Sequence, residues 1–232
     1  MSELWRSHEN SKYQNVLIST FVMLFICTDF IAASKVCRVW SISFEGRLLF
    51  FPISYFFDDV LTEIYGYSAG RKTIWFGFFS LGFANLMSFI LIILPPDEIE
   101  WDHQEELQVI LGQSPRLIAG SLLSFVIGKF INIYLVSKSK IRFKGKYAWQ
   151  RSFSASIISE GIDTVLFFLI SFIGEMESHL FTEALVVSLV FKFVWLILMI
   201  PVVHFITTFL EHKEGFVHFD TNVNYNPFIF EF

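Results

Sequence analysis

Long apolar stretches separated by short polar segments dominate the pattern along this chain of 232 residues. About 17–25 mostly apolar residues cross a bilayer as a helix. Six stretches meet this requirement, and each is predicted to form a membrane-spanning helix: Val16–Ala33, Leu48–Tyr65, Thr73–Leu94, Leu117–Val136, Phe153–Ile173 and Ala184–Phe209. The predicted fold is an all-α membrane protein, with a transmembrane domain at residues 15–210 and short tails at residues 1–14 and 211–232.

The second stretch is the least regular of the six. It holds Pro52 near its start and three acids, Asp58, Asp59 and Glu63, in its second half. Proline removes a backbone hydrogen bond from a helix, and irregular backbone is tolerated at membrane depth where it lines a protein cavity. We therefore expect a helix here that is either broken or re-entrant.

The loops between the stretches alternate in charge. The loop Ser137–Ser152 carries six basic residues and no acid, whereas Pro95–Pro115 carries six acids and neither Lys nor Arg. Cytoplasmic loops hold the excess of Lys and Arg, so six spans would leave both termini in the cytoplasm. The first external loop departs from this rule, since it contains Lys35, Arg38 and Arg47.

Composition agrees with a lipid-embedded body, because only 17% of the residues are charged against about 25% in soluble domains. The net charge of −5 and the single basic loop give no support for a nucleic-acid partner. Cys27 and Cys37 match no metal or redox spacing. No phosphate-binding loop and no hydrolase motif is present. We predict a non-enzyme without cofactor or metal, while an intramembrane hydrolase built on paired acids stays as an alternative.

Charged side chains inside the apolar stretches are the best indication of function. A carboxylate at the bilayer centre costs ~2.5–3.5 kcal/mol on insertion scales, so its presence points to a polar path or pocket. The candidates are six acids and two bases: Asp29, Asp58, Asp59, Glu63, Glu160, Asp163, Lys129 and Lys192. Of these, Asp29 lies near the end of its stretch and is interpreted as a boundary residue.

Two acid pairs have helical spacing. Asp59 and Glu63 are four residues apart and Glu160 and Asp163 three apart, so each pair shares one helix face. We predict that both pairs line one binding cavity, with two lysines as charge partners, Lys129 and Lys192. The alternative is that these groups form buried ion pairs that only hold the bundle together.

Two neutral polar residues complete the set of substrate-binding candidates. Asn85 lies in the middle of the third stretch, where an amide commonly bonds a neighbouring helix and can also contact a ligand. Tyr55 could stack on a planar ligand. The oligomeric state is left open by the sequence.

The segment FFPISYFFDDVLTEIYGYSAGRKTIWFGF resembles the signature of the queuosine precursor transporter family, which is grouped with the vitamin uptake transporters. The matching residues are Phe51, Pro52, Ser54, Tyr55, Asp59, Glu63, Tyr65, Gly66, Arg71, Ile74, Trp75 and Gly77. Three further segments are similar to the family: PRLIAGSLLSFVIGKFINIYLVSKSK, EGIDTVLFFLISFIG and the tail FDTNVNYNPF. Three positions depart from the family pattern. This chain has Ala69-Gly70 where Ala-Arg is usual, and Lys129 where the family often has Gln. Glu160 lies in the neighbourhood of another Gln of the family.

The resemblance implies import of a purine-like 7-deazaguanine, either a queuosine precursor or queuine, across a bacterial inner membrane for tRNA queuosine salvage. The residues suit such a ligand, because a carboxylate accepts two parallel N–H donors in fork geometry and aromatic rings can enclose a flat bicycle. One alternative is a substrate-binding subunit for another vitamin that works with an ATPase module, and another is the intramembrane hydrolase.

Overall fold

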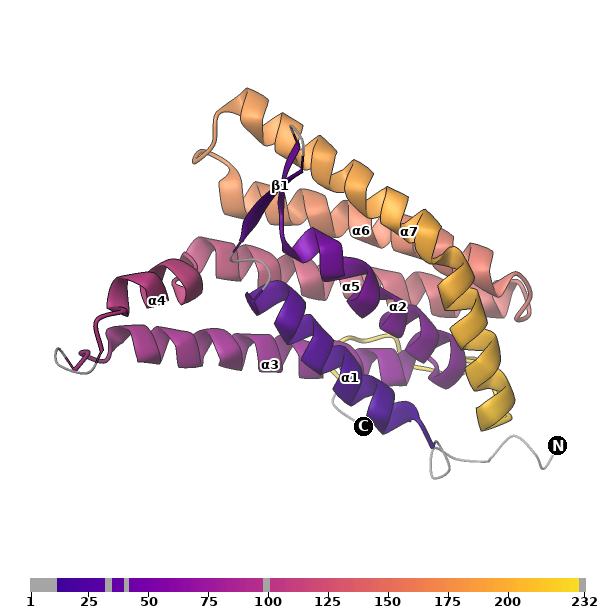
Figure 1. The fold of residues 1–232 in the computed structure, drawn as a ribbon. Helices are drawn as coiled ribbons and strands as arrows, with labels where there is room; N and C mark the ends of the chain where they lie inside the picture. Colours follow the sequence, from indigo (N-terminus) through magenta and orange to yellow (C-terminus); the bar gives the residue numbers. More distant parts are fainter. Residues whose placement is uncertain (1–11, 32–34, 40–41, 98–100, 230–232) are drawn as a thin grey trace.

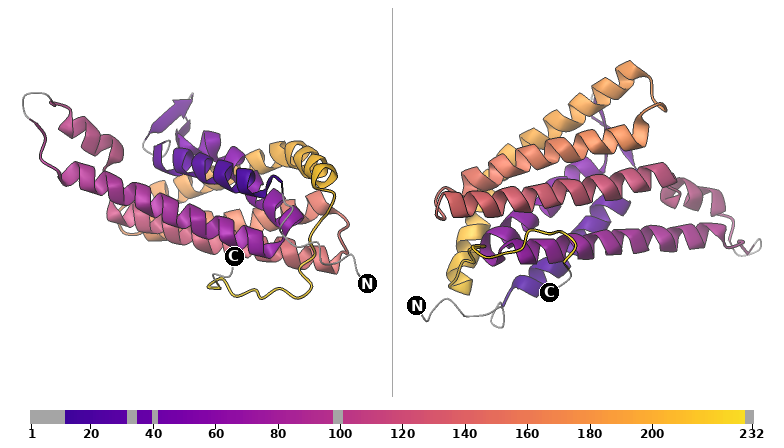
Figure 2. Two further views of the ribbon diagram at one scale, coloured as in Figure 1. Left: turned by 90° about the horizontal axis from the view of Figure 1, so that it is seen from below. Right: turned by 180° about the vertical axis from the view of Figure 1, so that it is seen from behind.

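A computed structural model describes residues 12–31, 35–39, 42–97 and 101–229, with the side chains of residues 36, 39, 42, 43, 45 and 51–56 outside that description. The elements in chain order are α1 (Gln14–Ile26), the π-helix η2 (Cys27–Ile31), β1 (Val36–Val39), β2 (Ile42–Glu45), α2 (Arg47–Tyr65), α3 (Tyr67–Ile93), α4 (Gln104–Leu111), α5 (Pro115–Arg142), α6 (Ala148–Phe172) and α7 (Ser178–Glu214). Helices α3, α5 and α6 form one layer, and α1, α2 and the end of α7 lie across it (Figures 1 and 2).

Five helical stretches of the described chain are long and apolar enough to cross a membrane; they contain α1, α3, α5, α6 and α7. Helix α2 is not among them, because Asp58, Asp59 and Glu63 raise the charge of its apolar stretch. The prediction of a multi-pass helical membrane protein is confirmed, whereas the count of six spans is not.

The predicted break at Pro52 is wrong, because α2 is one uninterrupted α-helix. Pro52 lies in the second turn of α2. It comes shortly after the first four residues, whose N–H groups have no partner within any helix. The missing N–H of the proline therefore removes a single bond close to the helix start, and the helix continues through the three acids.

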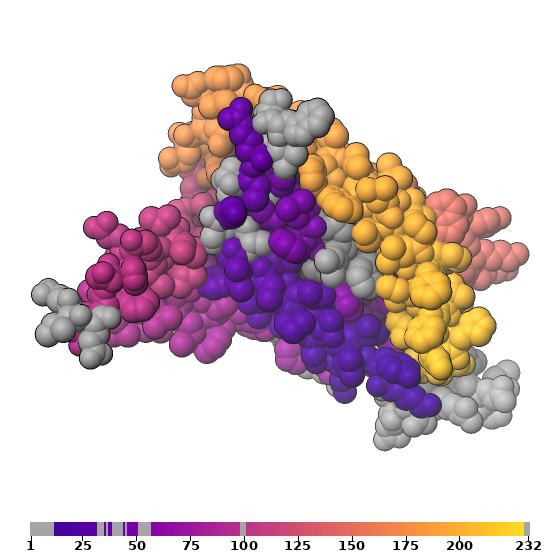
Figure 3. Space-filling view, viewed as in Figure 1, coloured from indigo at the N-terminus to yellow at the C-terminus, as the bar shows by residue number. Residues whose placement is uncertain are grey.

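Helix α2 is surrounded by protein along its second half. It contacts α1, α3, α5 and α7, and α1 and α7 lie on either side of it in Figure 3. Every residue from Phe57 to Tyr65 is buried, with Val60, Leu61 and Ile64 packing against α1, α3 and α7. The acids of α2 therefore face other helices rather than lipid, which is the condition under which a membrane tolerates them.

Helices α5 and α6 make the most extensive helix–helix contact of the described chain. Gly128 allows their backbones to approach closely, because a Cβ atom there would lie 2.8 Å from the Cβ of Asp163. Small residues at such crossings are typical of membrane helix packing. The close approach fixes Asp163 of α6 against α5.

Three features of the fold were not predicted. The loop after the first span contains a short antiparallel hairpin, in which Val36 pairs with Glu45 and Val39 with Ile42. The acidic loop contains the exposed helix α4. After α7, the chain does not leave the bundle: residues 216–229 pass along α3 (Figure 2), where Val223 and Tyr225 pack against the core cluster of α1, α3 and α5.

Candidate functional site

A chain of buried ion pairs runs through the bundle. Lys129 of α5 lies 2.6 Å from Asp58 of α2 and 3.9 Å from Glu160 of α6. Lys192 of α7 lies 3.2 Å from Glu160 and 2.9 Å from Asp163. The order is Asp58, Lys129, Glu160, Lys192, Asp163, so two cations link acids from α2 and α6. The acid that contacts Lys129 most closely is Asp58, which was not among the predicted binding residues.

Asp59 has a different kind of environment. Its Oδ1 accepts a hydrogen bond from the side-chain amide of Asn132 in α5 at 2.7 Å, and its Oδ2 accepts one from the Ser156 hydroxyl in α6 at 2.8 Å. Both donors are neutral. Although Asp58 precedes it directly in α2, the two carboxylates thus lie in separate networks.

Glu63 forms a third group, one helical turn further along α2. Its Oε1 lies 2.8 Å from Nη2 of Arg151 and 3.8 Å from Nζ of Lys140, and Lys140 also donates to the backbone carbonyl of Glu63. Both cations were assigned to a cytoplasmic loop, yet Arg151 is 5% exposed and Lys140 is fully buried. Through these contacts, Lys140 and Arg151 join the ends of α5 and α6 to α2.

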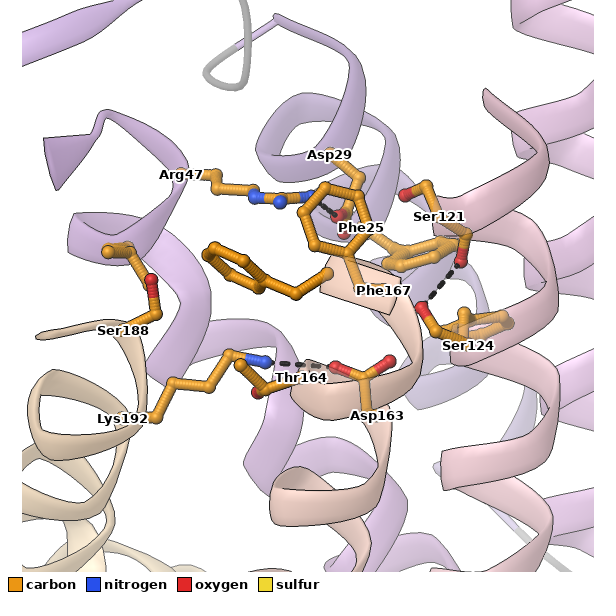
Figure 4. Close-up of a pocket in the computed structure, with 13 residues that line it drawn as sticks. Phe25, Asp29, Arg47, Ser121, Ser124, Asp163, Thr164, Phe167, Ser188 and Lys192 are labelled. Carbon is orange, nitrogen blue, oxygen red and sulfur yellow. Dashed lines mark hydrogen bonds and ion pairs between the residues drawn. The ribbon is translucent and has the colours of Figure 1, made fainter. Parts of the chain in front are cut away.

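A cavity of about 40 Å³ lies between α1, η2, α2, α5, α6 and α7 (Figure 4). It is lined by Phe25, Asp29, Arg47, Leu48, Ser121, Ser124, Phe125, Asp163, Thr164, Phe167, Phe168, Ser188 and Lys192. One water needs about 10–15 Å³ in this measure, so the closed cavity suits a few waters and is too small for a two-ring base. It does combine four aromatic rings, four hydroxyl-bearing residues and two carboxylates.

An ion pair and an aromatic ring lie together at one side of the cavity. Nη1 of Arg47 lies 3.6 Å from Oδ1 of Asp29, and its guanidinium carbon lies 4.2 Å from the centroid of Phe167 (Figure 4). Sequence reasoning assigned Asp29 to a boundary and Arg47 to a loop. The signal that could have joined them is that each lies at the end of an apolar stretch that faces the same external loop.

The predicted substrate-binding residues divide between the cavity and its surroundings. Asp163 and Lys192 line the cavity, and Glu160 and Lys129 continue the ion-pair chain behind it. Asp59 and Glu63 are not among the lining residues of the cavity. Asn85 donates a hydrogen bond to the Leu81 carbonyl of its own helix at 2.9 Å. The side chain of Tyr55 lies outside the described residues.

A cavity lined by charged groups within a bundle of apolar helices is an arrangement typical of multi-pass membrane transport proteins. The chain belongs to the family described as "Putative vitamin uptake transporter", whose family model matches residues 46–206. It is therefore a membrane transporter and not an enzyme.

Among curated proteins, the chain is similar to the "Probable queuosine precursor transporter" of Bacillus subtilis (strain 168). The two are 26% identical over 157 residues, which cover 67% of this chain and 68% of the relative. No solved structure matches the chain.

Proposed function

We propose that this protein imports a 7-deazaguanine precursor of queuosine, or queuine itself, and that the base binds in the cavity between α1, α2, α5, α6 and α7. The observation that carries the proposal is the combination of the Asp163 carboxylate with four phenylalanine rings in that cavity. A deazaguanine presents N1–H and an exocyclic amine as parallel donors, and an ionised carboxylate accepts such a pair in fork geometry.

Lys192 gives the cavity a way to release Asp163 to a ligand. The ammonium contacts Glu160 and Asp163 at similar distances, 3.2 and 2.9 Å. When donors of the base occupy Asp163, Lys192 stays paired with Glu160. The ammonium of Lys192 therefore keeps an acidic partner. An uncompensated buried charge would be costly.

Entry of a base requires the cavity to open, because its present volume is too small. The contact of Arg47 with Asp29 and Phe167 lies on the side of the external loop, and the contact of Glu63 with Arg151 and Lys140 lies toward the basic loop. We propose that these two contacts open in turn, so that the cavity faces one side of the membrane at a time.

The proposed topology has six spans, with α2 as the sixth spanning helix, in a bacterial inner membrane with both termini cytoplasmic. The 19 residues of α2 extend over about 28 Å at 1.5 Å per residue, close to the ~30 Å of the hydrocarbon core. The loop charges support the orientation, since the basic loop follows α5 and the acidic loop follows α3.

Queuosine salvage tests the proposal. A bacterial strain that can neither make nor import 7-deazaguanine precursors, but keeps the later steps to queuosine, receives this gene and a supplied 7-deazaguanine. Queuosine in tRNA retards migration in boronate gels, and we expect this shift only when both gene and base are present. The proposal is wrong if 7-cyano-7-deazaguanine, 7-aminomethyl-7-deazaguanine and queuine all give no shift while the protein is found in the membrane.

A further inference from the structure

Asp59 is the one described acid of α2 and α6 that has no basic nitrogen within 4.0 Å. We propose that Asp59 binds and releases a proton in each transport cycle, so that import is coupled to proton movement across the membrane. The proton site is a property of the chain itself, whereas its coupling to import rests on the proposed function.

The first support is the contrast between Asp59 and the other acids nearby. Asp59 is 6% exposed, and no Lys, Arg or His nitrogen of the described residues lies within 4.0 Å of its oxygens. Its contacts are the neutral donors Asn132 and Ser156. Each of the other acids of α2 and α6, Asp58, Glu63, Glu160 and Asp163, lies within 4.0 Å of a basic nitrogen.

The second support is that both charge states of Asp59 can be satisfied in place. As a carboxylate, it accepts from Asn132 and Ser156. As a carboxylic acid, it can donate from Oδ2 to the same Ser156 oxygen, because a hydroxyl is both donor and acceptor, while Asn132 continues to donate to Oδ1. An acid held at 2.6 Å by Lys129, as Asp58 is, has no such freedom.

The charged groups that face Asp59 leave the local balance negative. On its own helix these are Asp58 and, one turn away, Glu63, which is paired with Arg151 and Lys140. From α5 the charged group is Lys129, which already lies between Asp58 and Glu160. Among the described residues, the hydrogen bonds of Asp59 go to α5 and α6, and no ion pair joins it to α1, α3 or α7. A proton would remove one negative charge at this position, where lipid surrounds the bundle and charge is costly.

The location of Asp59 connects its protonation to the opening of the bundle. The carboxylate belongs to α2, while its two donors belong to α5 and α6, the most extensively packed helix pair. Movement of α2 against that pair would break both hydrogen bonds. An ionised Asp59 loses charge stabilisation when it separates, whereas a protonated Asp59 loses only neutral bonds, which are weaker.

Transport by the purified full chain in proteoliposomes tests the coupling. The probe is labelled 7-cyano-7-deazaguanine, because it is uncharged and a membrane potential alone cannot concentrate it. We expect a pH gradient of one unit to support accumulation of up to about tenfold, the ratio that one unit represents. Asp59→Asn can keep hydrogen bonds to Asn132 and Ser156, so this variant should still exchange labelled for unlabelled base. It should lose the accumulation driven by the pH gradient, and Asp59→Glu should recover part of that accumulation. Accumulation by Asp59→Asn equal to that of the unchanged protein overturns the proposal.

A readout without substrate separates the proton site from the proposed function. Infrared difference spectra of the full chain at high and low pH report the C=O band of a newly protonated carboxylic acid. We expect a buried band, slow to shift in deuterated water, that disappears in Asp59→Asn and persists in Asp58→Asn. If the band is absent, or persists in Asp59→Asn, the proton site is excluded. If the band behaves as expected but no base is exchanged, the proposed substrate is wrong and the proton site stands.

Discussion

Arg71 of α3 donates a hydrogen bond from Nη1 to the backbone carbonyl of Asn226, 155 positions later in the chain, at 3.1 Å. The same nitrogen donates to the carbonyl of Asn224 at 3.2 Å. Arg71 is 4% exposed. A buried guanidinium therefore holds the C-terminal segment against the helix bundle.

The contact belongs to a ladder along one face of α3. Tyr67, Arg71 and Trp75 are spaced four residues apart, so their side chains lie on one face. The Tyr67 hydroxyl donates to the carbonyl of residue 225 at 3.0 Å, and Trp75 Nε1 donates to that of residue 227 at 2.8 Å. Four consecutive carbonyls, 224–227, thus have donors on α3, which is what non-helical backbone needs when it packs against membrane helices.

We expect Arg71→Lys to loosen the C-terminal segment. Lysine keeps the charge but presents a single ammonium in place of the planar guanidinium, and a hydrogen bond to a charged group contributes about 1.5–3 kcal/mol. The purified variant should unfold at a lower temperature, and the segment after Gly215 should become sensitive to protease. Lys146→Ala, which removes an exposed cation, is the control. Unchanged protease resistance in Arg71→Lys would show that the ladder does not hold the segment.

Glu63 and Arg151 should show strong coupling in a double-mutant cycle. Removal of one partner of a buried ion pair costs about 3–5 kcal/mol, because the other charge is left uncompensated. We expect Glu63→Gln to destabilise more than Arg151→Gln, since Lys140 remains 3.8 Å from Glu63 in the latter.

Unfolding in denaturing detergent measures the cycle. The double variant should lose clearly less stability than the two single losses added together, since residues in direct contact couple by about 0.5–3 kcal/mol. Additive losses would mean that Glu63 and Arg151 act independently, and the proposed closure of this end of the bundle would then have no support.

The apolar pattern predicted the five helices that are long and apolar enough to cross a membrane, because the bilayer sets both length and hydropathy. The predicted stretch Phe153–Ile173 corresponds to α6, Ala148–Phe172. The same physics predicted that Lys129 and Lys192 have acidic partners, since an unpaired ammonium is costly in lipid. Of the candidate site, this reasoning reached Asp163 and Lys192, two residues that line the cavity.

The apolar pattern did not predict which polar side chains at helix ends are buried. Lys140 and Arg151 lie in a run of basic residues, and nothing in their order distinguishes them from their exposed neighbour Lys144. They are buried because α5 extends to Arg142 and α6 begins at Ala148, so both end turns pack against α2.

The C-terminal segment, residues 211–232, was interpreted as a short tail after the last predicted span. Its order depends on donors of α3 about 150 positions earlier and on its own asparagines. Asn224 and Asn226 accept from the N–H groups of residues 226 and 228, each at 3.0 Å. Such turns are a common role of asparagine, so the N-x-N spacing predicts local turns but not what they pack against.

Cysteine labelling should place the basic loop in the cytoplasm. In a variant without Cys27 and Cys37, a single cysteine is introduced at Asp102 or at Lys144, both exposed. We expect a membrane-impermeant maleimide to label position 102 in intact spheroplasts and position 144 only after lysis. Labelling of position 144 from outside would reverse the orientation, since charge alternation is its basis.

Asp163→Asn should lower uptake at least about tenfold, the equivalent of the weakest charge-assisted bond at about 1.5 kcal/mol. The substituted amide offers one donor toward the cavity, where the N–H groups of a deazaguanine need an acceptor. Lys192 remains paired with Glu160 at 3.2 Å, so the variant should still insert and fold.

Asn85→Ala is the matched control, because both positions hold a buried polar side chain in a spanning helix. Asn85 donates to a carbonyl of its own helix at 2.9 Å and does not line the cavity, so uptake should persist. Thermal unfolding of both variants separates folding from binding. If Asp163→Asn transports normally but melts earlier, its carboxylate serves the bundle. If Asn85→Ala instead abolishes uptake without loss of stability, the base binds beside α3, and the cavity around Asp163 is not the substrate site.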